Sequence, residues 1–162
     1  MIQKKICLVG VPAVGKTSLV RRYVDGRFSD AYLTTIGVKI DRHVTRIDNT
    51  DVTLLVWDLA GDDVLTPLRA TYLRGAHGLL FVADGTRAGT LDRAQALQAE
   101  IRDALGPLPS VLALNKADLE TDWEIEPARV EAVRADGGIV TSAKTGDHVA
   151  ESFAALARRT LA

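Results

Sequence analysis

Short apolar runs alternate along the chain with segments in which apolar residues recur every three or four positions. The short runs are bounded by charged or turn residues, a pattern that is typical of strands. The wider spacing is typical of helices that bury one face. We expect strands at residues 4–9, 38–47, 52–58, 79–83, 111–114 and 139–141. We expect helices at residues 16–23, 66–73, 91–105, 126–135 and 148–161.

The order of these elements predicts the class of fold. Residues 38–47 and 52–58 alternate apolar and polar positions, and residues 48–51 between them have the composition of a hairpin turn. The other strands alternate with helices, which implies parallel pairing and helices on both faces of the sheet. We therefore expect a three-layer α/β fold whose six-stranded, mostly parallel sheet has one antiparallel edge strand, with about five helices. Ligands of such sheets bind beyond the carboxyl ends of the strands.

Length, charge and cysteine content narrow the class of protein. The 162 residues fit one domain, which we expect to span residues 1–162. The net charge of −1, with both signs mixed, gives no drive toward nucleic acid or anionic lipid. The apolar runs are too short to span a bilayer, and the N-terminus lacks the features of a secretory signal. The single cysteine, Cys7, fits a reducing, cytoplasmic location, and we interpret it as a core residue.

Residues 10–17 read GVPAVGKT and match the phosphate-loop pattern G-x-x-x-x-G-K-[ST] between a predicted strand and a predicted helix. The glycines allow the backbone to curl so that successive N–H groups point at an anion, and the helix start adds further N–H groups. Lys16 is placed to reach the β- and γ-phosphates, and Thr17 offers a hydroxyl to Mg²⁺. The alternative is an ordinary strand-to-helix turn, which would leave Lys16 without a partner at a helix start that disfavours cations.

Residues 115–118 read NKAD and indicate which base is bound. An aspartate at position 118 can accept two hydrogen bonds, from the N1–H and the exocyclic amine of guanine, whereas adenine offers no such donor pair. Each hydrogen bond to a charged acceptor contributes about 1.5–3 kcal/mol. Asn115 and Lys116 would brace the loop and cover the ring. A solvated turn after a strand is the alternative interpretation of these four residues taken alone.

With these motifs the chain resembles the Ras superfamily of small GTPases, most closely its Rab-like members and their prokaryotic relatives. The resemblance covers essentially the whole chain, with the motifs in the family's order and spacing. The segments that carry it are residues 10–18, Phe28, residues 34–37, 57–61, 72–76, 115–118 and 142–144. It implies a P-loop NTPase G domain that binds GTP and GDP with Mg²⁺, hydrolyses GTP and acts as a switch. It also implies a monomer whose regulators and effectors bind through switches I and II.

The resemblance assigns roles to individual residues. Thr35 would meet Mg²⁺ and the γ-phosphate in the GTP state, Asp58 would hold Mg²⁺ through water, and the Gly61 N–H would bind the γ-phosphate. Phe28 would pack against guanine and the Ala143 N–H would bind its carbonyl, while Trp57 is interpreted as core. The expected metal ligands are Thr17, Thr35 and Asp58, and the expected catalytic residues are Lys16, Thr35, Gly61 and Asp62. The expected nucleotide-binding residues are Gly10, Ala13, Val14, Gly15, Lys16, Thr17, Ser18, Phe28, Thr35, Gly61, Asn115, Lys116, Asp118, Ser142, Ala143 and Lys144.

Two residues depart from the family's pattern. Asp62 stands where hydrolytic members usually carry the glutamine that orients the attacking water. An ionised aspartate only accepts hydrogen bonds and adds negative charge near the γ-phosphate, so we expect slow intrinsic hydrolysis. A solvated loop carboxylate without a role is the alternative. Pro12 removes an N–H from the phosphate loop, and its ring could crowd the entry of a partner's arginine or be tolerated loop variation.

The sequence is compatible with two interpretations of the C-terminus and with more than one function. The chain ends without the cysteine that carries a prenyl group in many relatives, so no direct membrane anchor is expected in it. Either the protein stays soluble, or a tail or further domains lie outside this sequence. An enzyme that switches is the first hypothesis, and a nucleotide-dependent scaffold with negligible hydrolysis is the second. Residues 115–118 argue against the third, a P-loop ATPase or small-molecule kinase.

Overall fold

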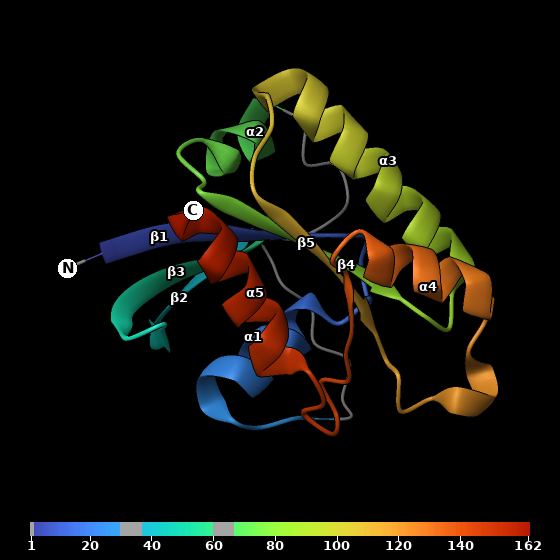
Figure 1. Ribbon diagram of the computed structural model, residues 1–162. Helices are drawn as coiled ribbons and strands as arrows, with labels where there is room; N and C mark the ends of the chain where they lie inside the picture. Colours follow the sequence, from blue (N-terminus) through green and yellow to red (C-terminus); the bar gives the residue numbers. More distant parts are fainter. Residues whose placement is uncertain (1, 30–36, 60–66) are drawn as a thin grey trace.

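The computed structural model describes residues 2–29, 37–59 and 67–162, and in this part of the chain strands and helices alternate as predicted (Figure 1). The strands are β1 (Ile2–Val9), β2 (Val38–Ile47), β3 (Thr50–Leu59), β4 (Gly78–Asp84), β5 (Ser110–Asn115) and β6 (Ile139–Val140). The helices are α1 (Lys16–Asp25), α2 (Pro67–Leu73), α3 (Ala88–Leu105), α4 (Pro127–Ala135) and α5 (Val149–Leu161), with a short 3₁₀ turn, η1 (Glu120–Asp122).

The described strands form one sheet in the order β2-β3-β1-β4-β5-β6. Strand β2 runs antiparallel to β3, and every other pair is parallel. The connection between β2 and β3 is a tight turn in which Asp48 and Asn49 have φ of 48° and 69°. Positive φ at both central residues is what the natural twist of a two-residue hairpin requires, and Asn and Asp tolerate it. The predicted mostly parallel, six-stranded sheet with one antiparallel edge strand is confirmed.

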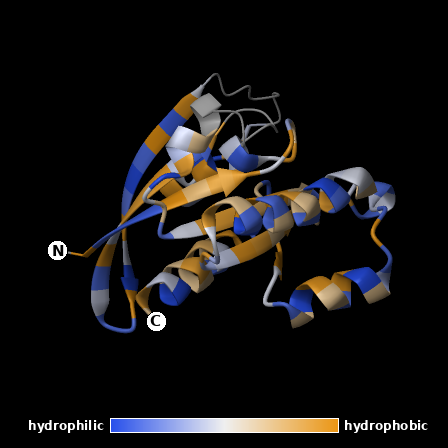
Figure 2. Cartoon of the chain, turned by 90° about the horizontal axis from the view of Figure 1, so that it is seen from above, coloured by the Kyte–Doolittle hydropathy of each residue, from blue (hydrophilic) through white to orange (hydrophobic). Residues whose placement is uncertain are grey.

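Helices cover both faces of the sheet and make three layers. Helices α1 and α5 lie on one face, and α2, α3 and α4 lie on the other (Figure 1). Strand β1 shows why, because its side chains alternate between two apolar clusters. Ile6 and Leu8 join the cluster under α1 and α5, whereas Cys7 and Val9 join the cluster under α2, α3 and α4. The central strands are mainly hydrophobic, and the helices carry both kinds of residue, as Figure 2 shows.

The boundaries differ from the predicted ones by a few residues. Helix α3 begins at Ala88, three residues before the predicted start, because the Ala88 N–H is satisfied by Glu124 Oε1 from a distant segment at 2.8 Å. Helix α1 continues to Asp25, two residues beyond the prediction, and ends at Gly26 with φ of 70°. The 3₁₀ turn η1 was not predicted. None of the described helices is long and apolar enough to cross a membrane.

Trp57 was predicted to be a core residue, and its ring packs partly buried against the cluster under α2, α3 and α4. The Lys5 ammonium lies 3.8 Å from the centroid of the ring, within the range of a cation–π interaction. Trp57 therefore lies at the margin of the core, packed against it, rather than inside it.

Strands β1, β4 and β5 bring three segments to one edge of the sheet. They are neighbours and parallel, so their carboxyl ends at Val9, Asp84 and Asn115 lie at the same edge of the sheet. The loop after β1, the turn after β4 and the loop after β5 therefore meet at the edge where a ligand of such a sheet binds.

Candidate functional site

The loop between β1 and α1 needs its two glycines for different steric reasons. A Cβ on Gly10 would lie 2.5 Å from the backbone oxygen of Val82, because β4 passes close by. A Cβ on Gly15 would lie 2.4 Å from Asn115 Nδ2, and Gly15 also has φ of 102°, a value that other residues rarely adopt. The curl of this loop is thus fixed by contacts with β4 and with the loop after β5.

Three consecutive carbonyls of the loop are held by side chains from elsewhere. Arg87 Nη2 donates to the Pro12 carbonyl at 3.1 Å, Lys116 Nζ to that of Ala13 at 2.9 Å, and Asn115 Nδ2 to that of Val14 at 3.1 Å. In a trans peptide the N–H points opposite to the carbonyl of the preceding residue. The N–H groups of Ala13, Val14 and Gly15 therefore face away from these three side chains, toward the inside of the loop.

Lys16 lies inside the loop. Its side chain is only 7% exposed, and Nζ donates to the carbonyls of Gly10 at 2.8 Å and Val11 at 3.2 Å. A buried ammonium group is costly unless it is paired and hydrogen-bonded. The loop thus concentrates positive charge and backbone N–H groups in one place, which is the chemistry that binds phosphate.

Thr17 and Asp58 bring two hard oxygen ligands together. The Thr17 hydroxyl donates to Asp58 Oδ2 at 2.5 Å, joining the start of α1 to the end of β3. Asp58 is fully buried. Hydroxyl and carboxylate oxygens are ligands that suit Mg²⁺. This ion is usually bound by one or two carboxylates together with phosphate oxygens and water.

Asn115 joins the phosphate loop to two other segments. Its Nδ2 donates to the Val14 carbonyl, and its Oδ1 accepts from the Thr141 hydroxyl at 3.1 Å and the Ala143 N–H at 3.3 Å. The side chain is 2% exposed, so both ends of the amide are satisfied within the protein. Asn115 therefore has a bracing role in the structure, as the sequence predicted for it.

Asp118 and the loop of residues 142–144 lie next to each other. Asp118 Oδ1 accepts a hydrogen bond from the Ser142 hydroxyl at 2.7 Å. From α1, Arg22 Nε donates to the Ala143 carbonyl at 2.8 Å, and Arg22 Nη2 donates to the Lys144 carbonyl. The 142–144 loop is thus held against Asp118 on one side and against α1 on the other.

Asp84, at the end of β4, collects an unusual number of donors. Its side chain is 1% exposed, and Oδ1 accepts from the N–H and the hydroxyl of Thr86 at 2.8 and 2.7 Å. Oδ2 lies 3.0 Å from both Arg87 Nε and Lys116 Nζ. Burial by itself would raise the pKa of Asp84, but the hydrogen bonds from Thr86, Lys116 and Arg87 outweigh it and lower the pKa below its ordinary value. Asp84 therefore stays ionised inside the site.

Phe28 and Ser18 occupy the periphery of the described site. Phe28 is half-buried and packs against the cluster under α1 and α5, and Ser18 follows Thr17 in the first turn of α1. Three predicted residues, Thr35, Gly61 and Asp62, lie outside the described residues, so their roles stay predictions.

The sequence analysis missed Arg22, Asp84, Thr86, Arg87 and Thr141. Asp84 carried a usable signal, because an acidic residue directly after a buried strand resembles Asn115 directly after the next one. Arg22 and Arg87 carried none, since an arginine in a helix or turn is ordinarily a solvated side chain. Only the fold brings their guanidinium groups to backbone carbonyls far away in the sequence.

A phosphate loop at the carboxyl edge of this six-stranded sheet defines a P-loop nucleotide-binding protein. Residues 5–162 match the model of the Ras family, so the chain belongs to that family. The fold and the guanine motif agree with it. The protein is a Rab-like small GTPase, a GTP-binding molecular switch, and the predicted family is confirmed.

Individual relatives support the same assignment. The chain is 38% identical to the GTP-binding protein ypt5 of Schizosaccharomyces pombe, with 98% of this chain and 78% of the relative covered. It is 33% identical to the Ras-related protein Rab-1 of Theileria parva, over 95% of this chain and 72% of the relative. It is 31% identical to the Ras-related protein Rab-13 of Bos taurus, over 95% of this chain and 78% of the relative.

Proposed function

We propose that the chain acts as one G domain that binds GTP and GDP with Mg²⁺ at the edge formed by β1, β4 and β5, and that it hydrolyses GTP slowly. The observation that carries the proposal is the set of three outward carbonyls at Pro12, Ala13 and Val14, held by Arg87, Lys116 and Asn115. An inward-facing row of N–H groups beside Lys16 fits the oxygens of a di- or triphosphate.

The Mg²⁺ part of the proposal is supported by the donor set. Thr17 and Asp58 supply hard oxygen atoms next to the loop, and Thr35 would add a third in the GTP state according to the family resemblance. When bound, Mg²⁺ would neutralise phosphate charge. The protein's own part is to hold the phosphates with Lys16 and the loop N–H groups, and to keep the Asp58 carboxyl group in place through the Thr17 hydroxyl.

The preference for guanine is supported by Asp118 and its surroundings. The Ser142 hydroxyl orients the carboxylate, and the adjacent loop is held in place by the Ala143 N–H, which donates to Asn115 Oδ1. ATP at the same concentration should therefore leave bound GDP in place in a competition assay. Displacement of GDP by ATP would remove the proposed base preference.

Slow hydrolysis is proposed because of Asp62. The carboxylate cannot donate to a phosphoryl oxygen while it accepts from water, as a glutamine amide can. We expect the Asp62→Gln variant to raise the single-turnover rate with GTP and Mg²⁺ by roughly a hundredfold, the lower end of what a positioned acid–base group contributes. GDP formation measured by chromatography gives the rate, and Asp63→Gln, which changes the neighbouring charge, serves as the control.

The opposite result has a specific meaning. If the wild-type rate equals that of glutamine-bearing relatives and falls in the Asp62→Ala variant, Asp62 is a working base and slow hydrolysis is refuted. If GDP never forms while GTP stays bound, the second candidate, a nucleotide-dependent scaffold, replaces the enzyme. In both cases regulators and effectors would bind through the segments around Thr35 and Gly61, with the protein acting as a cytoplasmic monomer.

A further inference from the structure

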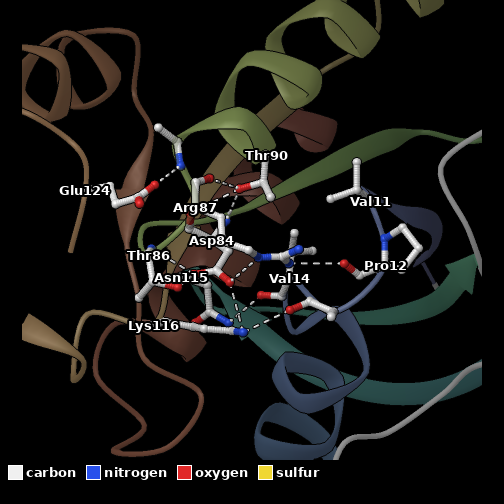
Figure 3. A network of polar contacts seen from close by, with 12 residues as sticks. Val11, Pro12, Val14, Asp84, Thr86, Arg87, Thr90, Asn115, Lys116 and Glu124 are labelled. Atoms are coloured by element: carbon white, nitrogen blue, oxygen red, sulfur yellow. Dashed lines mark hydrogen bonds and ion pairs between the residues drawn. The ribbon is translucent and has the colours of Figure 1, made fainter. Parts of the chain in front are cut away.

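Asp84 anchors two cations, and each cation holds one carbonyl of the phosphate loop. Lys116 Nζ lies 3.0 Å from Asp84 Oδ2 and donates to the Ala13 carbonyl at 2.9 Å. Arg87 Nε lies 3.0 Å from the same oxygen, and Arg87 Nη2 donates to the Pro12 carbonyl at 3.1 Å. Figure 3 shows both connections running from the turn after β4 to the phosphate loop. Lys116 belongs to the guanine motif, but Arg87 belongs to no motif of the sequence.

Arg87 uses the fork of its guanidinium to connect two acceptors. Nε serves Asp84 and Nη2 serves Pro12, so the two bonds fix the plane of the group and thereby the place of the Pro12 carbonyl. A lysine would have to bring its one ammonium nitrogen within reach of both acceptors at once, as Lys116 does for Asp84 and Ala13, and it has no plane that fixes their relative positions. What arginine adds is a rigid planar group that reaches the two acceptors with two different nitrogens.

Pro12 is the residue of the loop that most needs such support. It has no N–H, so its carbonyl is the only hydrogen-bonding group of its backbone. The next residue, Ala13, has φ of 66°, an uncommon conformation for a residue with a side chain. Arg87 holds the Pro12 carbonyl before Ala13, and Lys116 holds the carbonyl of Ala13 itself. The two hydrogen bonds stabilise this conformation, and with it the direction of the Ala13 N–H.

The turn that carries Arg87 is itself rigidly supported. The Thr90 hydroxyl accepts from the Asp84 N–H at 2.8 Å and donates to the Arg87 carbonyl at 2.8 Å. Glu124 Oε1 accepts from the Ala88 N–H, and a Cβ on Gly85 would collide with the ring of Trp123. The guanidinium thus projects from a fixed base, although its side chain is 45% exposed.

We propose that Arg87 is a positioning residue of the nucleotide site, which holds the Pro12 carbonyl from Asp84 and so keeps the phosphate loop in the shape that retains a nucleoside diphosphate. The inference rests on the proposed function of the same site. Without Arg87 the loop loses one charge-assisted hydrogen bond and samples other conformations, and each departure turns the Ala13 N–H away from the phosphates.

The test compares wild type, Arg87→Ala, Arg87→Lys and Arg129→Ala. Each protein is loaded with fluorescent GDP and Mg²⁺, release is followed after adding excess GDP, and the unfolding midpoint is measured with GDP bound. Arg129, on α4, is the matched control, because it too pairs with an aspartate, Asp92, and bonds a second residue, Gln95, and both partners belong to α3 rather than to the phosphate loop.

We expect Arg87→Ala to release GDP about tenfold faster than wild type, the factor expected for one hydrogen bond to a charged group at a half-exposed position. Arg87→Lys keeps a positive charge next to Asp84, so its unfolding midpoint should equal that of wild type. Its rate of GDP release should nevertheless stay close to that of Arg87→Ala. Arg129→Ala releases GDP at the wild-type rate.

Three results would overturn the inference, each in a distinct way. Release from Arg87→Ala at the wild-type rate would show that the Pro12 carbonyl needs no clamp. Recovery of both midpoint and release in Arg87→Lys would show that Arg87 only balances the charge of Asp84. Failure of the wild type to bind GDP at all would refute the proposed function, and this inference with it.

Discussion

Asp118 shows at the scale of one residue how the site would choose its base. Its carboxylate is only partly buried, and the Ser142 hydroxyl at 2.7 Å fixes one of its oxygens. A carboxylate presents acceptors only, so a partner with two adjacent donors is favoured. Guanine has that pair, and the choice depends on the acceptor character of Asp118 rather than on its size.

The Asp118→Asn variant separates these two properties. We expect its affinity for GDP to fall by roughly a hundredfold. The NH₂ group of the asparagine would face an N–H donor of guanine, and a hydrogen bond that contributes about 1.5–3 kcal/mol would be lost. The ring of xanthosine diphosphate carries a carbonyl in place of the amine, so the affinity of the variant for this nucleotide should fall much less than that for GDP, or rise. Equilibrium fluorescence titration with both nucleotides measures the change, and equal losses for the two would contradict the proposed role of Asp118.

Sequence alone gives predictions for residues whose chemistry is local and none for residues whose chemistry depends on the fold. The phosphate loop could be predicted because its glycines, Lys16 and Thr17 follow one another in the chain. Asn115 was predicted as a brace because its motif follows a strand. Arg87 could not be predicted, because the Pro12 carbonyl that it holds lies 75 residues away in the sequence.

At the scale of elements, the approach of β4 to the phosphate loop is what restricts position 10. A methyl group on Gly10 would sit 2.5 Å from the Val82 carbonyl oxygen, and 3.2 Å from a methyl of Val14. The first of these contacts is with backbone in the middle of a buried strand, which cannot give way cheaply. The close packing of β1 and β4 therefore depends on a residue without a side chain.

We expect Gly10→Ala to lower the free energy of unfolding by about 1–3 kcal/mol, the usual cost of forcing an extra methyl group into a packed core. Gly89→Ala is the control, because a Cβ there meets no atom within 4 Å and the residue lies in the first turn of α3. That variant should be stabilised by about 0.5–1 kcal/mol, since alanine loses less entropy than glycine in a helix. Denaturant unfolding measures both, and a stabilised Gly10→Ala would show that β4 can move.

The elements themselves were largely predictable, since each buries one face and repeats its apolar residues accordingly. The start of α3 was not, because Ala88, Gly89 and Thr90 lack a strong start signal, and the acceptor for the Ala88 N–H comes from Glu124. The strand order was not predictable in detail either, although the parallel class was. Both depend on contacts between segments that are distant in the sequence.

For the whole molecule, the reactivity of the buried Cys7 thiol measures how often the region around β1 becomes exposed to solvent. It is fully buried in the middle of β1, and burial raises the pKa of its thiol to about 12, with Lys5 acting weakly in the opposite direction. The reactive thiolate is therefore about a thousandfold rarer at pH 8 than in an unfolded chain. Labelling requires that the sheet first separate from the helices around it.

We expect a thiol reagent at pH 8 to modify native protein at least about a thousandfold more slowly than protein in denaturant, with a further slowing when GDP and Mg²⁺ are added. The added ligand stabilises the folded state and leaves the thiol itself untouched. Absorbance of the released reagent follows the reaction, and Cys7→Ala gives the background. Labelling at the rate of a free thiol would mean that the region around β1 opens without global unfolding.

Asn115 has a consequence for anyone who wishes to redesign this protein. One buried amide ties the Val14 carbonyl, the Thr141 hydroxyl and the Ala143 N–H together. Base recognition and phosphate retention are thus not separable modules that could be exchanged one at a time between scaffolds. If the 115–118 loop were replaced by that of another protein, the phosphate loop and the 142–144 loop would have to be replaced with it. All three segments are hydrogen-bonded to, or contain, the one Asn115 side chain.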